Sequence, residues 1–161
     1  MHPKIINLKK LKRILPLKRK NKTIAFTNGC FDILHYGHIK YLSQAKKLAD
    51  ILIVGVNSDT SVKKIKGEGR PINPLRQRME VVAALSSVDY VVSFTQPTPW
   101  FLIKTIKPDI LIKGGDWKKK NIVGSDIITS YGGKVLTLPY VKGVSTTDII
   151  NKIIKRFEKK R

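Results

Sequence analysis

Two histidines, His35 and His38, stand three residues apart where an apolar run over residues 23–26 gives way to helical periodicity. Backbone N–H groups at the start of a helix have no intrahelical partner, so they receive anions well. The two imidazoles add hydrogen-bond donors at the same point. Gly37, between them, has no side chain to block the approach of a phosphate. This combination suits the charge that develops on a phosphoryl group during transfer.

Two histidines near a helix start also occur as a surface pair or as half of an accidental metal site. The preceding turn argues against both, because Asn28-Gly29-x-Phe31-Asp32 comes directly before His35-x-Gly37-His38 at a strand-to-helix junction. A motif carries weight when its structural context agrees with it. We therefore expect this turn to be the centre of a functional site.

The periodicity predicts one domain over residues 1–161, an α/β Rossmann-like parallel sheet of about five strands with helices on both faces. Residues 1–21 form a basic helical segment packed on it, capped at Asn7 and ended or kinked by Pro16. The expected strands cover residues 23–26, 51–56, 88–94, 109–113 and 134–139. The expected helices cover 5–20, 37–49, a stretch from Asn73 and Pro74 onward, 98–106, 123–131 and a last helix after Thr147.

Three of these helices have an apolar face that we expect to point into the core. Residues 62–78, by contrast, read as an irregular basic loop because they combine several lysines and arginines with glycines and prolines. The apolar faces are Ile39, Leu42, Ala45 and Ala49; Leu75, Met79, Val82 and Ala83; and Ile149, Ile150, Ile153, Ile154 and Phe157.

Ligands of such sheets bind beyond the carboxyl ends of the strands. That rule brings Asn28, His35, His38, Asn57 and Asp59 around one crevice. The basic loop is well placed to close over a triphosphate, although a solvated charged loop explains most of its side chains equally well.

Arg78 lies on the first turns of a helix and is expected to point back into the crevice. Two further sites have two explanations each. Asp116, after Gly114 and Gly115, is either a ligand of sugar hydroxyls or an ordinary turn aspartate. Ser145 and Thr146 are either helix caps alone or part of a second phosphate-binding helix start.

The chain carries 32 Lys and Arg against 11 Asp and Glu, a net charge of +21. Such a charge raises a nucleic-acid hypothesis, but the lysines are spread along the chain, as in a compositionally biased proteome. The single cysteine, Cys30, cannot form an internal disulfide. No run is long enough to span a membrane and no signal peptide is recognisable, so we expect a cytoplasmic protein without membrane insertion.

The histidine turn resembles the signature of the nucleotidyltransferase superfamily of cytidylyltransferases and adenylyltransferases. Over residues 22–154 the chain looks most like the adenylyltransferases of ADP-heptose synthesis, in a stand-alone form without a fused sugar kinase. The motifs that carry this likeness are residues 26–35, Val56-Asn57-Ser58-Asp59, Lys66-Gly67-x-x-Arg70-Pro71-x-Asn73-Pro74, Lys113-Gly114-Gly115-Asp116 and Gly143-x-Ser145-Thr146-Thr147.

The resemblance implies transfer of an adenylyl group from ATP to D-glycero-β-D-manno-heptose 1-phosphate, with Mg²⁺ carried on the ATP and no dedicated metal site in the protein. It implies catalytic roles for His35, His38 and Lys66. Nucleotide-binding roles fall to Asn28, Gly29, Cys30, Phe31, Gly37, Arg78, Gly143, Ser145, Thr146 and Thr147. Sugar-phosphate roles fall to Asp32, Asn57, Asp59, Lys64, Arg70, Lys113, Gly115 and Asp116.

Two alternatives stay open. Cytidylyltransferases for glycerol 3-phosphate share the histidine and Ser-Thr-Thr motifs, but they usually have an arginine where this chain has Tyr140, and they lack the Lys-Gly-Gly-Asp pattern. A basic nucleic-acid-binding module is the more distant alternative, and no specific nucleic acid is expected as a partner. The resemblance also implies a homodimer and a separate heptose kinase and phosphatase in the pathway.

Overall fold

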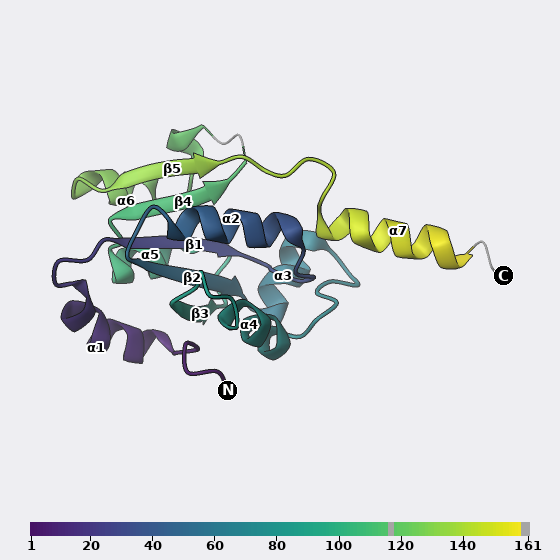
Figure 1. The fold of residues 1–161 in the computed structure, drawn as a ribbon, viewed down its shortest axis with the longest axis horizontal. Coiled ribbons are helices and arrows are strands. Elements are labelled where there is room, and N and C mark those ends of the chain that lie inside the picture. The colour runs from purple at the N-terminus through teal and green to yellow at the C-terminus, as the bar shows by residue number, and fades with distance from the viewer. Residues whose placement is uncertain (116–117, 159–161) are drawn as a thin grey trace.

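The computed structural model describes residues 1–115 and 118–158 and is built around a five-stranded parallel sheet (Figure 1). The strand order is β3-β2-β1-β4-β5. This confirms the expected α/β architecture. The strands are β1 (Ile24–Gly29), β2 (Ile51–Asn57), β3 (Tyr90–Phe94), β4 (Ile110–Gly114) and β5 (Lys134–Leu138).

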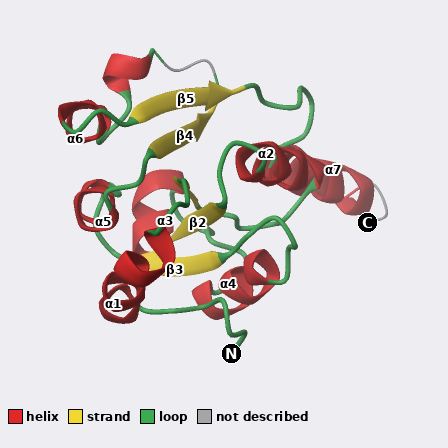
Figure 2. Ribbon diagram, turned by 60° about the vertical axis from the view of Figure 1, so that its left-hand side comes forward, coloured by secondary structure: helices red, strands yellow, loops and turns green. Residues whose placement is uncertain are grey.

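Helices cover both faces of the sheet, as Figure 2 shows. The buried residues of α1, α5 and α6 pack in one hydrophobic cluster and those of α2 and α4 in another. The helices are α1 (Leu8–Arg19), α2 (Tyr36–Lys46), α3 (Asp59–Lys66), α4 (Leu75–Ala83), α5 (Trp100–Ile106), α6 (Ser125–Ser130) and α7 (Thr146–Glu158), with a 3₁₀ turn η1 (Lys119–Asn121).

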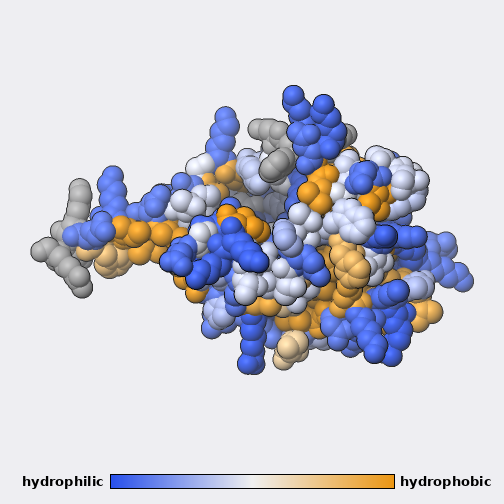
Figure 3. Space-filling view, turned by 180° about the vertical axis from the view of Figure 1, so that it is seen from behind, coloured by the Kyte–Doolittle hydropathy of each residue, from blue (hydrophilic) through white to orange (hydrophobic). Residues whose placement is uncertain are grey.

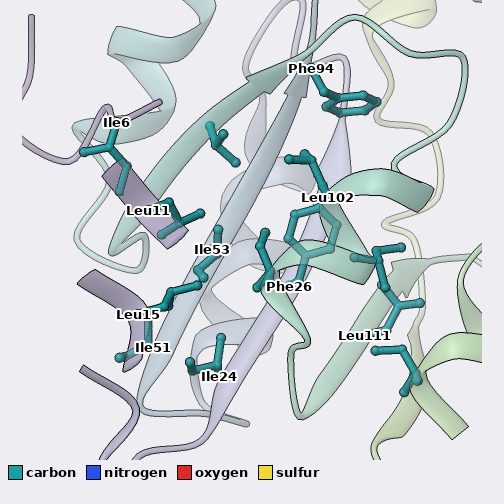
Figure 4. Close-up of a cluster of buried hydrophobic side chains, with 14 of the residues drawn as sticks. Ile6, Leu11, Leu15, Ile24, Phe26, Ile51, Ile53, Phe94, Leu102 and Leu111 are labelled. Atoms are coloured by element: carbon teal, nitrogen blue, oxygen red, sulfur yellow. The ribbon is translucent and has the colours of Figure 1, made fainter. Parts of the chain in front are cut away.

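The central strands are apolar on both sides because each of their faces meets a helix layer. In β1, Ile24 and Phe26 join the α1/α5/α6 cluster, while Ala25 between them joins the α2/α4 cluster. Figure 4 shows the first of these clusters, with Phe26 lying among side chains from β2, β4 and α5. The continuous apolar runs of the sequence therefore mark buried strands.

Helix α1 begins as expected, because Asn7 accepts a hydrogen bond from the Lys10 N–H at 2.8 Å. Pro16 does not end it, and the helix continues to Arg19. A proline in a helix removes one backbone hydrogen bond, but tertiary contacts hold this last turn. Leu15 is buried beside it, and the Arg19 guanidinium donates to Asp109 at 3.0 Å.

The N-terminal segment covers part of the edge of the sheet at β3. Ile5, which we expected in the first helix, instead forms an isolated parallel bridge with Val91. The N–H of Ile6 donates to the Val91 carbonyl at 3.0 Å, and the Val91 N–H donates to Lys4 at 2.9 Å. The helix therefore begins only at Leu8.

Three local expectations were wrong. The expected basic loop begins with a helix, α3, which Ser58 caps by accepting from the Ser61 N–H at 3.2 Å. Helix α4 begins at Leu75 with Pro74 in the capping position, one residue later than expected. Ile39 on α2 remains 44% exposed, although Leu42 and Ala45 are buried as expected.

The largest difference concerns α7, whose apolar side chains we expected to point into the core. None of its residues is buried, and Ile153, Ile154 and Phe157 are 50%, 45% and 66% exposed. Figure 1 shows the helix extending away from the sheet toward the C-terminus. Periodicity correctly indicated an amphipathic helix, but its apolar face is not covered by the rest of the described chain. None of the described helices is both long and apolar enough to span a bilayer.

Candidate active site

A cavity of about 770 Å³ opens beyond the carboxyl ends of the strands. Strand β1 pairs with β2 on one side and with β4 on the other, so the chain connections reverse direction at β1. Crevices at such a reversal are where parallel α/β sheets bind ligands. The cavity wall comes from the ends of β1 and β4, the starts of α2 and α7, the end of α3 and the segment over residues 139–145.

The two histidines lie at the start of α2, and their rings stack. His35 occupies the N-cap position with an extended backbone, φ −144° and ψ 170°. Its ring centroid is 3.7 Å from that of His38, with 22° between the planes, and the Phe31 ring lies 5.1 Å from His38. A side chain at Gly37 would approach the His35 ring to 3.1 Å. The absence of a side chain at Gly37 thus allows the His35 ring to pack closely against the start of α2.

Burial lowers the pKa of His38 to about 4, and the neighbouring His35 contributes in the same direction. Burial likewise lowers the pKa of His35. Nδ1 of each ring is buried and has no hydrogen-bond partner in the described part of the chain. The pair is therefore uncharged near neutral pH, and each ring offers one N–H donor.

A lysine and an asparagine connect the two strands that flank the reversal point. Lys113, at the end of β4, donates through Nζ to Oδ1 of Asn28 at the end of β1, at 2.6 Å. Burial lowers the pKa of Lys113 to about 8, so the ammonium form still predominates at neutral pH. This places a partly desolvated cation on the cavity wall next to the histidine turn.

Asp32 holds the loop between α3 and α4 in place. Its carboxylate accepts from Arg70 Nε at 2.5 Å, from the Ile72 N–H at 2.8 Å and from the Asn73 N–H at 2.9 Å. Burial by itself raises the pKa of this carboxyl, but the Asn73 N–H and the Arg70 guanidinium outweigh it, and the pKa is lowered. These contacts make Asp32 the group that orients Arg70 at the cavity wall.

Arg78 differs from its expected role. Its side chain is 1% exposed and does not reach the cavity wall. The guanidinium donates to the carbonyls of Cys30, Asn57 and Asn73 and forms a 2.8 Å ion pair with Asp59. All three guanidinium nitrogens of Arg78 are bonded within the protein, to the segment after β1, the end of β2 and the segment before α4. Arg78 is therefore not available to hold a phosphate.

The first turn of α7 forms part of the cavity wall. Ser145 caps it, because its Oγ accepts from the Asp148 N–H at 3.0 Å and donates to the Asp148 carboxylate at 2.7 Å. Thr146 Oγ1 donates to the Ile33 carbonyl at 3.4 Å. A second helix N-terminus thus joins that of α2 at the cavity.

The glycine pair after β4 is covered by an aromatic ring. Side chains at Gly114 and Gly115 would meet the Tyr140 ring at 2.7 and 2.5 Å, and Gly115 has φ +100°. A side chain at either position would collide with the Tyr140 ring, so the two glycines allow its close packing. Tyr140 is 70% exposed and forms part of the cavity wall.

Most of the expected site residues come together on this wall: Asn28, Gly29, Cys30, Phe31, Asp32, His35, Gly37, His38, Asn57, Lys66, Arg70, Lys113, Gly143, Ser145, Thr146 and Thr147. Asp59, Lys64, Arg78 and Gly115 do not line it. Asp59 instead pairs with Arg78, and Lys64 is exposed on α3. The expectation for Asp116 lies outside the described residues. The individual binding roles stay predictions.

Several lining residues were not among the expected site residues, and three of them make contacts that shape the site. Asp148 completes a Ser-x-x-Asp capping pattern that was visible in the chain. Tyr41 lies three residues after His38, one helical turn along α2, and its hydroxyl is 2.6 Å from Thr27 Oγ1 and donates to Ile112 at 3.1 Å. Tyr140 was noted in the sequence only as a departure from the cytidylyltransferases, and its place on the wall depends on the packing of its ring against Gly114 and Gly115.

Comparison with known proteins identifies the family of this chain. A family model described as cytidylyltransferase-like matches residues 26–152. Two proteins named "Bifunctional protein HldE" are similar in sequence: that of Proteus mirabilis is 52% identical over 94% of this chain and 32% of its own length, and that of a Nitratiruptor species is 56% identical over 85% and 29%. The chain thus spans about a third of the length of these relatives.

Two solved structures have a similar fold. The "lipopolysaccharide core biosynthesis protein" of Thermoplasma volcanium is 29% identical, covers 76% of this chain and 98% of its own, and superposes with a TM-score of 0.62. A pantoate-beta-alanine ligase from Francisella tularensis, 21% identical with a TM-score of 0.63 over 94% of this chain and 77% of its own, shares the fold alone.

A parallel sheet with paired histidines at a helix start beside the reversal point defines a nucleotidyltransferase-type protein. With the family model matching most of its length, the chain belongs to the cytidylyltransferase-like family.

The buried guanidinium of Arg78 leads to a prediction about stability. Arg78→Met should lower the free energy of unfolding by about 3 kcal/mol, because it leaves buried carbonyls and Asp59 without their donor. Chemical denaturation monitored by circular dichroism measures this change. Arg76→Met, on the exposed side of the same helix, is the matched control and should change stability little. Equal stability of the two variants would contradict the internal role of Arg78.

The lowered pKa of His38 leads to a prediction about pH. An unfolded imidazole takes up its proton near pH 6.5, whereas folded His38 does so only near pH 4. The unfolded state therefore binds more protons between these values, and the free energy of unfolding falls as the pH drops through this range. His38→Gln lacks this contribution and should show a shallower fall in denaturation curves collected from pH 8 to pH 4. Parallel curves for the two proteins would contradict the burial of a neutral His38.

Proposed function

We propose that this protein transfers an adenylyl group from ATP to D-glycero-β-D-manno-heptose 1-phosphate, giving ADP-heptose and pyrophosphate. The observation that carries this proposal is the stacked His35 and His38 pair at the start of α2, on the wall of a cavity at the strand-order reversal. Two helix N-termini and the side chains of Lys66, Arg70 and Lys113 give that wall the positive potential a triphosphate and a sugar phosphate require.

The choice of sugar is supported by sequence motifs and by the names of similar proteins. The motif Lys113-Gly114-Gly115-Asp116 and the loop that ends in Asn73-Pro74 resemble the adenylyltransferases of ADP-heptose synthesis. The Thermoplasma volcanium neighbour is named a lipopolysaccharide core biosynthesis protein, and the resemblance to the adenylyltransferases of ADP-heptose synthesis implies a product that supplies heptose to that core. The HldE relatives are described as bifunctional, which is consistent with an adenylyltransferase region joined to a second activity.

The proposed reaction is a direct in-line displacement. An anionic oxygen of the sugar phosphate attacks the α-phosphorus of ATP; a new P–O bond forms while the bond to the bridging oxygen of the β-phosphate breaks, and pyrophosphate leaves with that electron pair. The nucleophile is already an anion, so no general base is needed. Catalysis then consists of positioning and of stabilising the charge on the pentacoordinate phosphorus.

The proposed roles follow from where the side chains lie. His35 and His38 donate to the ATP phosphates, and the approach of that negative charge raises the pKa of the pair from its low value in the free protein. Lys66, at the end of α3, neutralises the α-phosphate. The start of α7 with Ser145, Thr146 and Thr147 holds the β- and γ-phosphates, a task that the burial of Arg78 leaves to it.

The other residues of the cavity wall contact either the nucleotide or the sugar phosphate. The turn over residues 28–31 lines the nucleotide side, where Gly29 and Phe31 shape the pocket. Lys113 and Arg70 bind the sugar phosphate, and Asp32 keeps Arg70 in place at 2.5 Å.

We further propose that Mg²⁺ enters bound to the triphosphate, where it offsets the charge of the phosphate oxygens. In residues 1–115 and 118–158 no three metal-ligating side chains come together, so carriage by the nucleotide suits the site. A cytoplasmic location, a homodimer, a single functional domain over residues 1–161 and partnership with a separate heptose kinase and phosphatase complete the proposal.

The substrate assignment is tested by pyrophosphate release. The protein is incubated with Mg²⁺, either ATP or CTP, and either heptose 1-phosphate or glycerol 3-phosphate. We expect release only from ATP with heptose 1-phosphate. Release from CTP with glycerol 3-phosphate would identify a cytidylyltransferase for a phosphorylated alcohol instead, and no release from any pair would overturn both assignments.

The histidine pair is tested separately. His38→Ala and His35→Ala should each lower kcat by about 10²-fold or more, the usual effect of removing one preorganised donor to a transition-state oxyanion. Steady-state kinetics at saturating substrates measures the effect. His2→Ala, which removes a histidine far from the cavity, is the control and should leave kcat unchanged. A variant within about twofold of wild type would remove that histidine from the mechanism.

A further inference from the structure

Helix α7 has two surfaces of opposite character. Its apolar residues recur at positions i, i+1, i+4, i+5 and i+8, so they share one face: Ile149, Ile150, Ile153, Ile154 and Phe157. Lys152 and Lys155 lie on the opposite side of the same helix, and Arg156 borders the apolar face. Figure 3 shows an apolar ridge along the projecting helix, bordered by hydrophilic side chains.

The apolar ridge is not part of the core. No residue of α7 is buried, and Phe157 is 66% exposed. The fold rests on two hydrophobic clusters, and neither includes a residue of α7. An exposed apolar ridge of this kind marks an interaction surface.

The charges around the ridge favour one kind of partner. The last part of the sequence is strongly basic, with a single acidic residue, Glu158, among Lys152, Lys155, Arg156, Lys159, Lys160 and Arg161. The other carboxylate of α7, Asp148, is engaged by Ser145. The whole chain carries +21. A partner with a negatively charged surface and an apolar layer directly beneath it would satisfy both faces of the helix.

An anionic lipid bilayer has both properties. A helix with an apolar face and a Lys- and Arg-rich polar face lies in the plane of the membrane interface, with the apolar side chains below the headgroups and the basic ones among them. A second copy of the chain meets the apolar requirement but not the electrostatic one, because a chain with a net charge of +21 offers no anionic surface to the basic residues of α7. We infer that α7 is a peripheral membrane anchor that docks this protein on anionic lipid surfaces.

Docking through α7 leaves the catalytic groups free. The ridge residues do not line the cavity, whereas the start of the same helix does. The helix therefore links the membrane contact to one wall of the active site. A homodimer formed through another surface is compatible with this arrangement.

The test is co-sedimentation of the full chain with vesicles of equal parts phosphatidylglycerol and phosphatidylethanolamine, with phosphatidylcholine vesicles as the uncharged comparison. We expect binding to the anionic vesicles only. The double variant Ile153→Gln/Phe157→Gln preserves every charge and the helix propensity, yet it should weaken binding by about tenfold or more, since burial of each large apolar side chain contributes more than a factor of ten. Leu17→Gln, which removes an 80% exposed leucine from α1, is the matched control and should bind like wild type.

Three results would overturn the inference. Equal binding by wild type and the double variant would mean that net charge alone attracts the protein to the vesicles. Absence of binding by wild type would exclude the anchor directly. Light scattering after size exclusion gives the third: a wild-type dimer that the double variant converts to a monomer would show that a second copy covers the ridge. Circular dichroism of each variant checks that it is folded.

Discussion

One buried guanidinium holds the edge of the sheet where ligands enter. The segments after β1 and β2 and the start of α4 each turn a carbonyl toward Arg78, which also pairs with Asp59. Polar backbone at the ends of parallel strands must find partners once it is buried, and a planar group with five donors can serve several acceptors at once. Arg78 is thereby withheld from the cavity, whose wall has other cationic side chains: Lys66, Arg70, Lys113 and Lys142.

Several features of the site lower the stability of the folded protein. Two stacked imidazoles with unpartnered Nδ1 atoms, a lysine with its pKa near 8 and a left-handed Phe31 backbone at φ +46° are all costly in a protein without ligand. They are tolerated because β1 and β2 pair over six residues and bury apolar side chains on both faces of the sheet. A phosphate chain entering this region would give donors and cations the partner that the free protein lacks.

Much of this arrangement could be predicted from the sequence. Continuous apolar runs predicted the strands, and the histidine turn together with the rule for parallel sheets predicted the site. The predictions that were wrong depended on tertiary contacts. Helix α3 was not predicted, because its lysines suggested a loop although its Val62 is buried. The sequence also did not show which way the Arg78 side chain points, nor what covers the apolar face of α7.

The bridge between Ile5 and Val91 limits the backbone pairing of one copy of the chain with another. A parallel sheet has two outer strands, and an uncovered outer strand offers free N–H and C=O groups to any other extended chain. Here the N-terminal segment occupies part of the β3 side, while on the β5 side the strand begins with an exposed lysine, Lys134, whose charge discourages intermolecular pairing. The first six residues, remote from the cavity, thus protect β3 from pairing with another chain. A chain that lacks them would expose the backbone of β3 and should form fibrils more readily.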